Sequence, residues 1–257
     1  MVRLGVWGLS FILAACAPKS PLPDMQPGET GRVVKIIDGD ALVLETGQSV
    51  RLVSILAPVL RPREGPPEPH AAESARLLED MVLGRRVQLY YPGLTRDRYD
   101  RALAHVVTAD GAGPALWLNQ AMVAAGGARV RLYAGTEARG RELLDAEADA
   151  RERRAGLWSR AVYAVRDAER LAPEASGFVM LRARLGPRLP DRTDEDDRYR
   201  PACFRALTSV TLTLRIDADA QTVCDLETDQ PVQIRGWLSR GILDLRHPWH
   251  IELVDPL

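Results

Sequence analysis

The sequence predicts a mainly β protein with attached helices, in which a small barrel is followed by a second, barrel-like β-domain. Three patterns support this class. In the first half of the chain, short β-rich runs alternate with tight turns. Runs with helical spacing of apolar residues follow them, and further β-rich runs fill the second half. A chain of 257 residues is long enough for two small domains.

The elements expected in the first half form one barrel with three helices. Strands are predicted at residues 32–37, 41–45, 49–56, 87–91 and 102–108. The turn Asp38-Gly39-Asp40 separates the first two strands, and Gly47 marks the next hairpin. Apolar residues at helical spacing predict helices at 71–83, 116–125 and 136–154, each closely followed by glycine. Short strands followed by helices indicate a small barrel.

The second half predicts another β-domain, over residues 177–257. Residues 161–176 are expected to be a linker or helical. The strands expected after it are residues 177–185, 206–216, 232–237 and 250–254. A charged loop at residues 190–201, which contains acidic residues and arginines, lies between them.

The composition excludes two broad classes of protein. With 46% hydrophobic and 27% charged residues, the chain can bury a core and is not disordered throughout. A formal net charge of −1 argues against a strongly basic nucleic-acid coat protein. It leaves a local basic site open.

The first sixteen residues predict export. One positive charge precedes an apolar stretch from Leu4 to Ala15, about half as long as a membrane-spanning helix. The ending Leu13-Ala14-Ala15-Cys16 resembles the bacterial lipobox, which implies cleavage before Cys16, lipidation of its thiol and attachment in the periplasm. Because Ala17 is not an aspartate, the outer membrane is the expected destination. The alternative is an ordinary signal peptide with an incidental cysteine.

The segment after Cys16 is expected to be a Pro-rich tether over residues 17–30, so that ordered structure begins at Gly31. In an exported protein, the two remaining cysteines, Cys203 and Cys224, lie in an oxidising compartment. They predict a disulfide, with two buried free thiols as the alternative.

Four motifs stand in order along residues 31–160. They are the strand that ends in Ile37-Asp38-Gly39-Asp40, the strand Arg51-Leu52-Val53 that runs on to Ala57-Pro58, the stretch Asp97-Arg98-Tyr99-Asp100-Arg101, and the terminal Gly156-Leu157-Trp158-Ser159. Together they resemble the staphylococcal nuclease (thermonuclease) family. The resemblance implies an OB-fold barrel of five strands with three helices. It also implies calcium-dependent hydrolysis of DNA or RNA phosphodiesters.

The resemblance assigns roles to five positions. Asp40 matches a metal carboxylate of the family, and Arg51 and Arg101 match two arginines that contact phosphate. Such arginines suit this role because a guanidinium group forks onto phosphate oxygens. Arg98 and Tyr99 match positions that contact the far end of the nucleotide.

The other catalytic groups of the family are missing. Where the family has Asp-Thr-Pro-Glu or Asp-Ala-Pro-Glu, this chain has Leu56-Ala57-Pro58-Val59. Leu56 thus replaces the second metal carboxylate, Val59 replaces the presumed general base, and Asp100 replaces the glycine of a Tyr-Gly-Arg motif. A calcium site with one carboxylate side chain is weak, and loss of a general base typically costs about 10²–10⁴-fold in rate.

This site can hold calcium only if other acidic side chains complete its set of ligands. Glu64 and Glu68 lie in the loop after the third strand, and Glu73 matches a position whose role in the family is structural. We therefore expect no cofactor, with calcium bound only if such acids complete the site. His70 and His105 lack partners at metal-ligand spacing and are expected to be ordinary surface or core residues.

The run that ends in Arg235-Gly236-Trp237 resembles the C-terminal extension of some proteobacterial thermonuclease-like proteins, which implies an OB-like module. OB modules often bind single strands through aromatic side chains and basic grooves. The aromatic candidates are Tyr199, Phe204 and Trp237. The alternative is a set of core aromatic residues beside a solvated acidic loop.

These patterns predict a membrane-anchored lipoprotein with a degenerate nuclease domain that binds phosphate, a nucleotide or nucleic acid. Two alternatives stay open. The first is an active metal-dependent endonuclease with replacement acids. The second is a non-catalytic structural or partner-binding protein of the envelope.

Overall fold

A computed structural model describes residues 20–190, 201–208 and 210–255. Cys16 and Tyr199 lie outside the described residues, as does nearly all of the predicted charged loop. Within the described ranges, no helix is both long enough and apolar enough to cross a bilayer.

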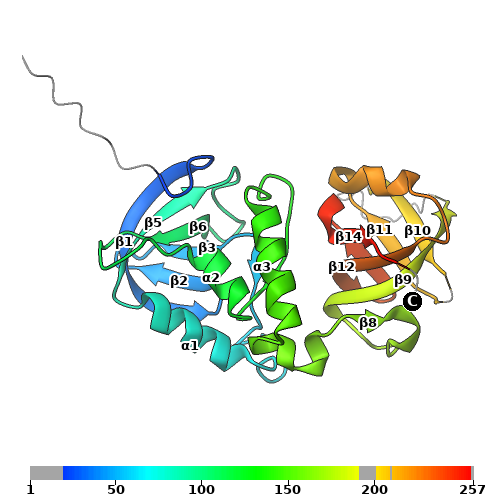
Figure 1. The fold of residues 1–257 in the computed structure, drawn as a ribbon, viewed down its shortest axis with the longest axis horizontal. Coiled ribbons are helices and arrows are strands. Elements are labelled where there is room, and N and C mark those ends of the chain that lie inside the picture. Colours follow the sequence, from blue (N-terminus) through cyan, green and yellow to red (C-terminus); the bar gives the residue numbers. More distant parts are fainter. Residues whose placement is uncertain (1–19, 191–200, 209, 256–257) are drawn as a thin grey trace, which may run out of the picture.

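The first half of the chain folds into a closed barrel (Figure 1). Its strands are β1 (Gln26–Asp38), β2 (Ala41–Leu44), β3 (Ser49–Leu52), β6 (Ala102–Thr108) and β5 (Arg86–Tyr91), in that order around the barrel. Neighbouring strands are antiparallel except for β3 and β6, which are parallel. The predicted five-stranded barrel is confirmed.

Three α-helices of the described chain pack against this barrel: α1 (Ala71–Val82), α2 (Leu118–Ala124) and α3 (Gly140–Glu152). Their buried residues recur at helical spacing, and in α1 these include Ala71, Ala75, Leu78 and Val82. The last helix begins at Gly140, later than the expected residue 136.

The C-terminal half forms a second closed barrel. Around it run β9 (Gly177–Leu189), β10 (Cys203–Leu207), β11 (Thr213–Ile216), β13 (Ile242–Leu245) and β12 (Pro231–Ser239), and β12 pairs back to β9. As in the first barrel, the third strand is parallel to the fifth, and the fourth closes onto the first. The two barrels therefore share one path of the chain, which is that of the OB fold.

Short elements complete the description. They are strands β4 (Ile55–Leu56), β7 (Arg129–Val130), β8 (Arg166–Asp167) and β14 (Ile251–Leu253), and the 3-10 helices η1 (Gly156–Ser159), η2 (Ala161–Tyr163), η3 (Ala168–Arg170), η4 (Ala218–Asp225) and η5 (Pro248–His250). The predicted disulfide is present and joins Cys203 at the start of β10 to Cys224 in η4, with 6.1 Å between their Cα atoms.

The N-terminal segment differs from the expected tether. β1 begins at Gln26, five residues before the predicted start of order, and Pro27 lies next to an irregularity in its pairing with β5. Leu22 and Met25 are buried against Tyr90 and Val107. The prediction failed because these two apolar residues cover the barrel wall, which the proline content does not reveal.

Two predicted strands are in fact broken. The strand expected at 49–56 divides at Ser54, whose φ of 67° is left-handed, so that β4 leaves the barrel. The strand expected at 206–216 is a hairpin of β10 and β11. Among the described elements, β13 was not predicted because residues 242–245 are too few to show alternation.

A buried ion pair fixes the second barrel against the first. Glu147 on α3, which lies between the barrels (Figure 1), has no solvent exposure and accepts a hydrogen bond of 2.6 Å from the Val130 N–H of β7. Its other oxygen pairs with Arg235 of β12, which is 4% exposed. Nearby, His250 Nε2 accepts a hydrogen bond of 2.9 Å from the Leu132 N–H. Three distant segments, α3, β7 and β12, thus meet at one carboxylate.

Removal of this carboxylate is expected to destabilise the protein strongly. In Glu147→Ala, Arg235 stays buried without a counterion, which costs about 3–5 kcal/mol. Glu142→Ala on the same helix is the control, because its ion pair with Arg139 is half exposed and costs about 0.2–1 kcal/mol. Urea unfolding measures both variants, and equal losses would contradict the structural role of Glu147.

Candidate functional site

The turn between β1 and β2 places Asp40 inside the protein. Gly39 is required there, because a Cβ atom would lie 1.8 Å from Ser74 Oγ and 2.9 Å from the Ala57 Cβ. Asp40 is 1% exposed. Its Oδ1 accepts a hydrogen bond of 2.9 Å from Arg51 Nη1, and its Oδ2 accepts one of 2.7 Å from the Ala57 N–H.

Through these contacts the Asp40 carboxylate fixes the Arg51 side chain and the backbone at Ala57. Burial raises the pKa of Asp40, while the Arg51 guanidinium and the Ala57 N–H lower it. The neighbouring Asp38 likewise accepts a hydrogen bond of 3.0 Å from the Leu60 N–H. The two aspartates therefore fix the segment that follows β4.

Leu56, which the resemblance sets at the position of a second metal carboxylate, is apolar and lies opposite an arginine. Leu56 on β4 is 8% exposed and is the register partner of Arg129 on β7. Across the described residues, no three histidine, cysteine or acidic side chains are grouped so that they could hold a metal ion. A calcium ion does not fit this donor set, because Asp40 is committed to Arg51 and a cation lies opposite Leu56.

One acid lies next to the position of the missing base. The Val59 N–H donates a hydrogen bond of 2.9 Å to Glu68 Oε2, and the Glu68 N–H donates one of 3.0 Å to the Val59 carbonyl. Glu68 and Val59 line the same pocket, whereas Glu64 does not line it. Glu73 lies on α1, 3.8 Å from Arg160.

The turn before β6 presents Arg98, Tyr99 and Arg101. Asp97 organises it, since its carboxylate accepts hydrogen bonds from the N–H groups of Tyr99 and Arg101 and pairs with the Arg101 guanidinium at 2.6 Å. Asp100 has a φ of 60°, so it keeps the left-handed backbone that a glycine would favour there.

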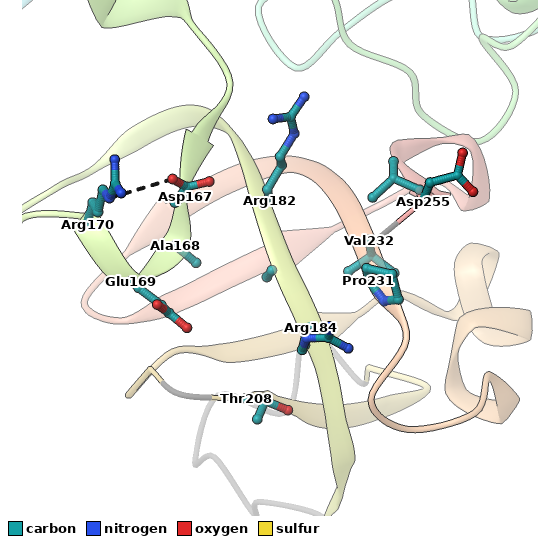
Figure 2. A pocket seen from close by; sticks show the side chains of 12 residues that line it. Asp167, Ala168, Glu169, Arg170, Arg182, Arg184, Thr208, Pro231, Val232 and Asp255 are labelled. Carbon is teal, nitrogen blue, oxygen red and sulfur yellow. Dashed lines mark ion pairs between the residues drawn. The ribbon is translucent and has the colours of Figure 1, made fainter. Parts of the chain in front are cut away.

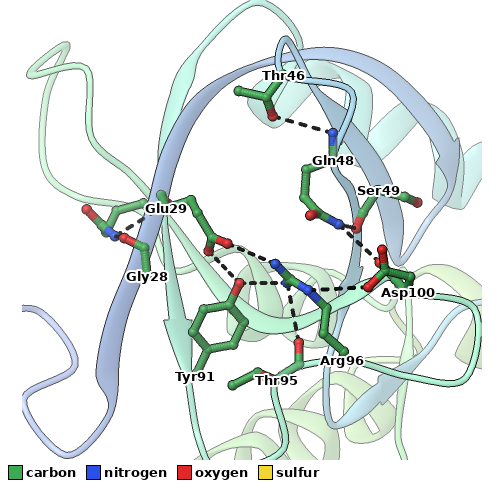
Figure 3. A network of polar contacts seen from close by, with 10 residues as sticks. Gly28, Glu29, Thr46, Gln48, Ser49, Tyr91, Thr95, Arg96 and Asp100 are labelled. Atoms are coloured by element: carbon green, nitrogen blue, oxygen red, sulfur yellow. Dashed lines mark hydrogen bonds and ion pairs between the residues drawn. The ribbon is translucent and has the colours of Figure 1, made fainter.

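A polar network joins this turn to neighbouring segments (Figure 3). Glu29 of β1 accepts hydrogen bonds from the Tyr91 hydroxyl at 2.5 Å and from Arg96 at 2.9 Å. Gln48 donates one of 3.3 Å to the Asp100 carbonyl. The arginine-bearing turn is therefore held by strands β1 and β5 and by the turn between β2 and β3.

These segments surround one pocket of about 620 Å³ to which both barrels contribute. Six arginines and two carboxylate side chains line it: Arg51, Arg96, Arg98, Arg101, Arg129 and Arg131, with Glu68 and Asp97. Tyr99 and Tyr133 come from the first barrel and its attached segments, while Phe178 and Trp237 come from the second barrel. The lining is therefore cationic and partly aromatic, and two carboxylates outside it, Asp40 and Glu29, pair with Arg51 and Arg96.

Sequence reasoning missed Arg129, Arg131 and Tyr133. The sequence Arg-Val-Arg-Leu-Tyr at residues 129–133 could have indicated them, because its alternation places the two arginines on the same face of a strand. The predicted residues Arg51, Arg98, Tyr99 and Arg101 all line the pocket, whereas Asp40 is buried behind it.

A second hollow, of about 490 Å³, lies on the C-terminal barrel (Figure 2). Three arginines and three carboxylates line it: Arg170, Arg182 and Arg184, with Asp167, Glu169 and Asp255. Because these charges balance, this hollow has no preference for an anion, and the first pocket is the stronger candidate.

Other residues noted in the sequence are structural. Burial lowers the pKa of His105 to about 3, and its Nδ1 accepts a hydrogen bond of 3.2 Å from Trp117 Nε1. His70 precedes α1, away from the pocket. Phe204 is buried in the second barrel, so it is no stacking residue.

Comparison with known proteins agrees with this geometry. Residues 49–160 match the family described as staphylococcal nuclease homologue. The thermonuclease of Staphylococcus hyicus is 24% identical over 139 residues, which cover 51% of this chain and 76% of that protein. For the thermonuclease of Staphylococcus intermedius the identity is 26% over 136 residues, covering 52% and 78%.

A protein of Bacillus anthracis described as uncharacterized is 31% identical over 134 residues, which cover 50% of this chain and 60% of that protein. All these similarities span about half of the chain. Residues 49–160 therefore form a domain of the staphylococcal nuclease family.

Proposed function

We propose that the arginine-lined pocket binds the phosphates of a nucleotide or nucleic acid and that the protein does not hydrolyse them with calcium. The six arginines that line one pocket carry this proposal. Three of them, Arg98, Arg129 and Arg131, have no ion-pair partner among the described residues. Guanidinium groups form strong, forked hydrogen bonds with phosphate oxygens, which favours Arg for this purpose.

Two of these arginines are well placed for a ligand. Within the described chain, Arg98 makes no ion pair and lies 4.8 Å from the Tyr99 ring centroid. Arg101 pairs with Asp97, but its side chain is 32% exposed, so an incoming phosphate can share it. The Arg51 guanidinium also neutralises buried Asp40, which makes Arg51 a poor choice for a test by truncation.

The same geometry argues against catalysis with calcium. The related staphylococcal proteins are named thermonucleases, and hydrolysis of a phosphodiester needs charge stabilisation and an activated water. Here Arg51 and Arg101 supply positive charge. Leu56 cannot bind a metal, and Val59 cannot accept a proton.

One observation favours a second candidate, an active hydrolase with a replacement base. Glu68 lies within 2.9 Å of the Val59 N–H and lines the pocket. Its carboxylate is thus near the position of the missing base. Activity that is lost in Glu68→Gln would support this candidate.

We expect Arg101→Ala to weaken the binding of a nucleoside 3′,5′-bisphosphate by about tenfold to a hundredfold, since a charge-assisted hydrogen bond is worth about 1.5–3 kcal/mol. Isothermal titration calorimetry at low and high salt measures the loss. Added salt should lower the bisphosphate affinity of the wild type more than that of the variant.

Arg85→Ala is the matched control for this measurement. Like Arg101, Arg85 pairs with an aspartate of a turn, here Asp110 at 2.7 Å, but it lies outside the pocket. Equal affinities of wild type, Arg101→Ala and Arg85→Ala would refute the proposed site. Failure of the wild type to bind would favour the structural or partner-binding alternative.

The protein is expected to show no calcium-stimulated cleavage of DNA or RNA. Leu56→Asp with Val59→Glu should create measurable calcium affinity, because a second carboxylate then lies near Asp40. Any gain in rate should stay small, since Arg129 is the register partner of position 56 and competes for the new carboxylate.

Cleavage is followed with a fluorescently labelled oligonucleotide, with and without a chelator. Robust calcium-dependent cleavage by the wild type that disappears in Asp40→Ala would contradict this expectation. It would mean that other acids complete the metal site.

We also propose that Cys16 carries lipid and anchors the protein in the outer membrane. The lipobox-like sequence Leu13-Ala14-Ala15-Cys16 motivates this proposal. In a bacterial host, Cys16→Ser should release the protein from the membrane fraction, as judged by fractionation and mass spectrometry. A wild-type protein whose N-terminal peptide lacks lipid would contradict it.

A further inference from the structure

The part of the pocket between the two barrels carries groups that the nuclease-like domain alone does not provide. Trp237 of β12 and Phe178 of β9 are register partners, so they lie side by side on one face of the second barrel. Trp237 is 42% exposed although it is a large aromatic residue. Both side chains line the same pocket as Arg51 and Arg101.

Arg129 is a buried cation at this junction. It is 6% exposed, and its guanidinium lies 5.1 Å from the ring centroid of Phe178 and 4.8 Å from that of Tyr163. Its Nη1 donates a hydrogen bond of 2.7 Å to the Phe178 carbonyl. Its Nε is buried and has no hydrogen-bond partner among the described residues. A buried, unsatisfied donor in a cationic pocket favours an incoming acceptor.

Arg131 extends this cationic surface toward the second barrel. Its guanidinium lies 4.9 Å from the Tyr133 ring centroid, 5.2 Å from that of Trp237 and 5.8 Å from that of Phe178. No carboxylate pairs with it in the described parts of the chain. Burial lowers its pKa, and the positive charge of nearby Arg51 acts in the same direction. A bound anion would reduce this electrostatic repulsion between the two arginines.

We infer that the two barrels bind one single-stranded nucleic acid together, with phosphates along Arg101, Arg51 and Arg131 and a base stacked on Trp237. The inference rests on the proposed function and adds the ligand class and a second subsite. Cations that alternate with accessible aromatic faces suit a single strand, because its bases are free to stack. The bases of a duplex are stacked on one another and cannot reach Trp237.

The test compares a short oligothymidylate with a nucleoside 3′,5′-bisphosphate on the full chain. Trp237→Ala should weaken oligothymidylate binding by about tenfold and bisphosphate binding far less. Arg131→Gln should weaken the binding of both ligands, because Arg131 lines the phosphate-binding pocket, and the loss should be larger for oligothymidylate. Trp237→Phe, which keeps an aromatic face, should retain most of the affinity. Because Trp237 is 42% exposed, its substitution is expected to leave the fold intact, and circular dichroism checks this.

Arg182→Ala is the matched control, because it removes an exposed arginine of the second barrel that lines the other hollow (Figure 2). It should bind oligothymidylate as the wild type does. If Trp237→Ala and Arg131→Gln also keep wild-type affinity, the inference is overturned, while bisphosphate binding that depends on Arg101 leaves the proposed function intact. Equal or tighter binding of a duplex of the same length would overturn it as well. Failure of the wild type to bind either ligand would refute both.

Discussion

The buried contact between Glu147 and Arg235 is the constraint on which the rest of the structure depends. It joins α3 of the first domain to β12 of the second, and the Val130 N–H of β7 donates to the same carboxylate. Burial of two charges is tolerated only when each is fully paired, so the geometry has little freedom. Because β7 carries Arg129 and β12 carries Trp237, this contact sets how the two halves of the pocket face each other, together with the hydrogen bonds from Leu132 to His250 and from Arg129 to the Phe178 carbonyl.

A second constraint supports the proposal that this site binds phosphate without calcium-dependent catalysis. In the turn between β1 and β2, Asp40 is buried and satisfied by Arg51 and the Ala57 N–H. A metal ion would have to displace Arg51 from Asp40, and Leu56 offers it no second ligand. The positive charge that a calcium ion would bring is supplied instead by arginines. Such charges bind phosphate without activating a water molecule.

Local pattern was enough to predict the barrels and the helices, because alternation and helical spacing follow directly from which face is buried. The disulfide was predicted from the expected export and the pair of cysteines. The motifs also singled out Arg51, Arg98 and Arg101, which line the same pocket. It failed where distant segments decide the outcome. The departure of β4 from the barrel at Ser54 depends on its pairing with β7. Trp237 lines the pocket only because the two barrels pack against each other. Glu147 did leave a signal, since it is a charged residue on the buried face of α3.

The central claim is that arginines, rather than a metal, hold the ligand in a pocket shared by the two barrels. Calorimetric titration of the full chain with a nucleoside 3′,5′-bisphosphate, in a chelator and again in excess calcium, tests it most directly. The structure predicts the same affinity in both conditions, with affinity that falls as salt is added. Binding that appears only when calcium is present would contradict it.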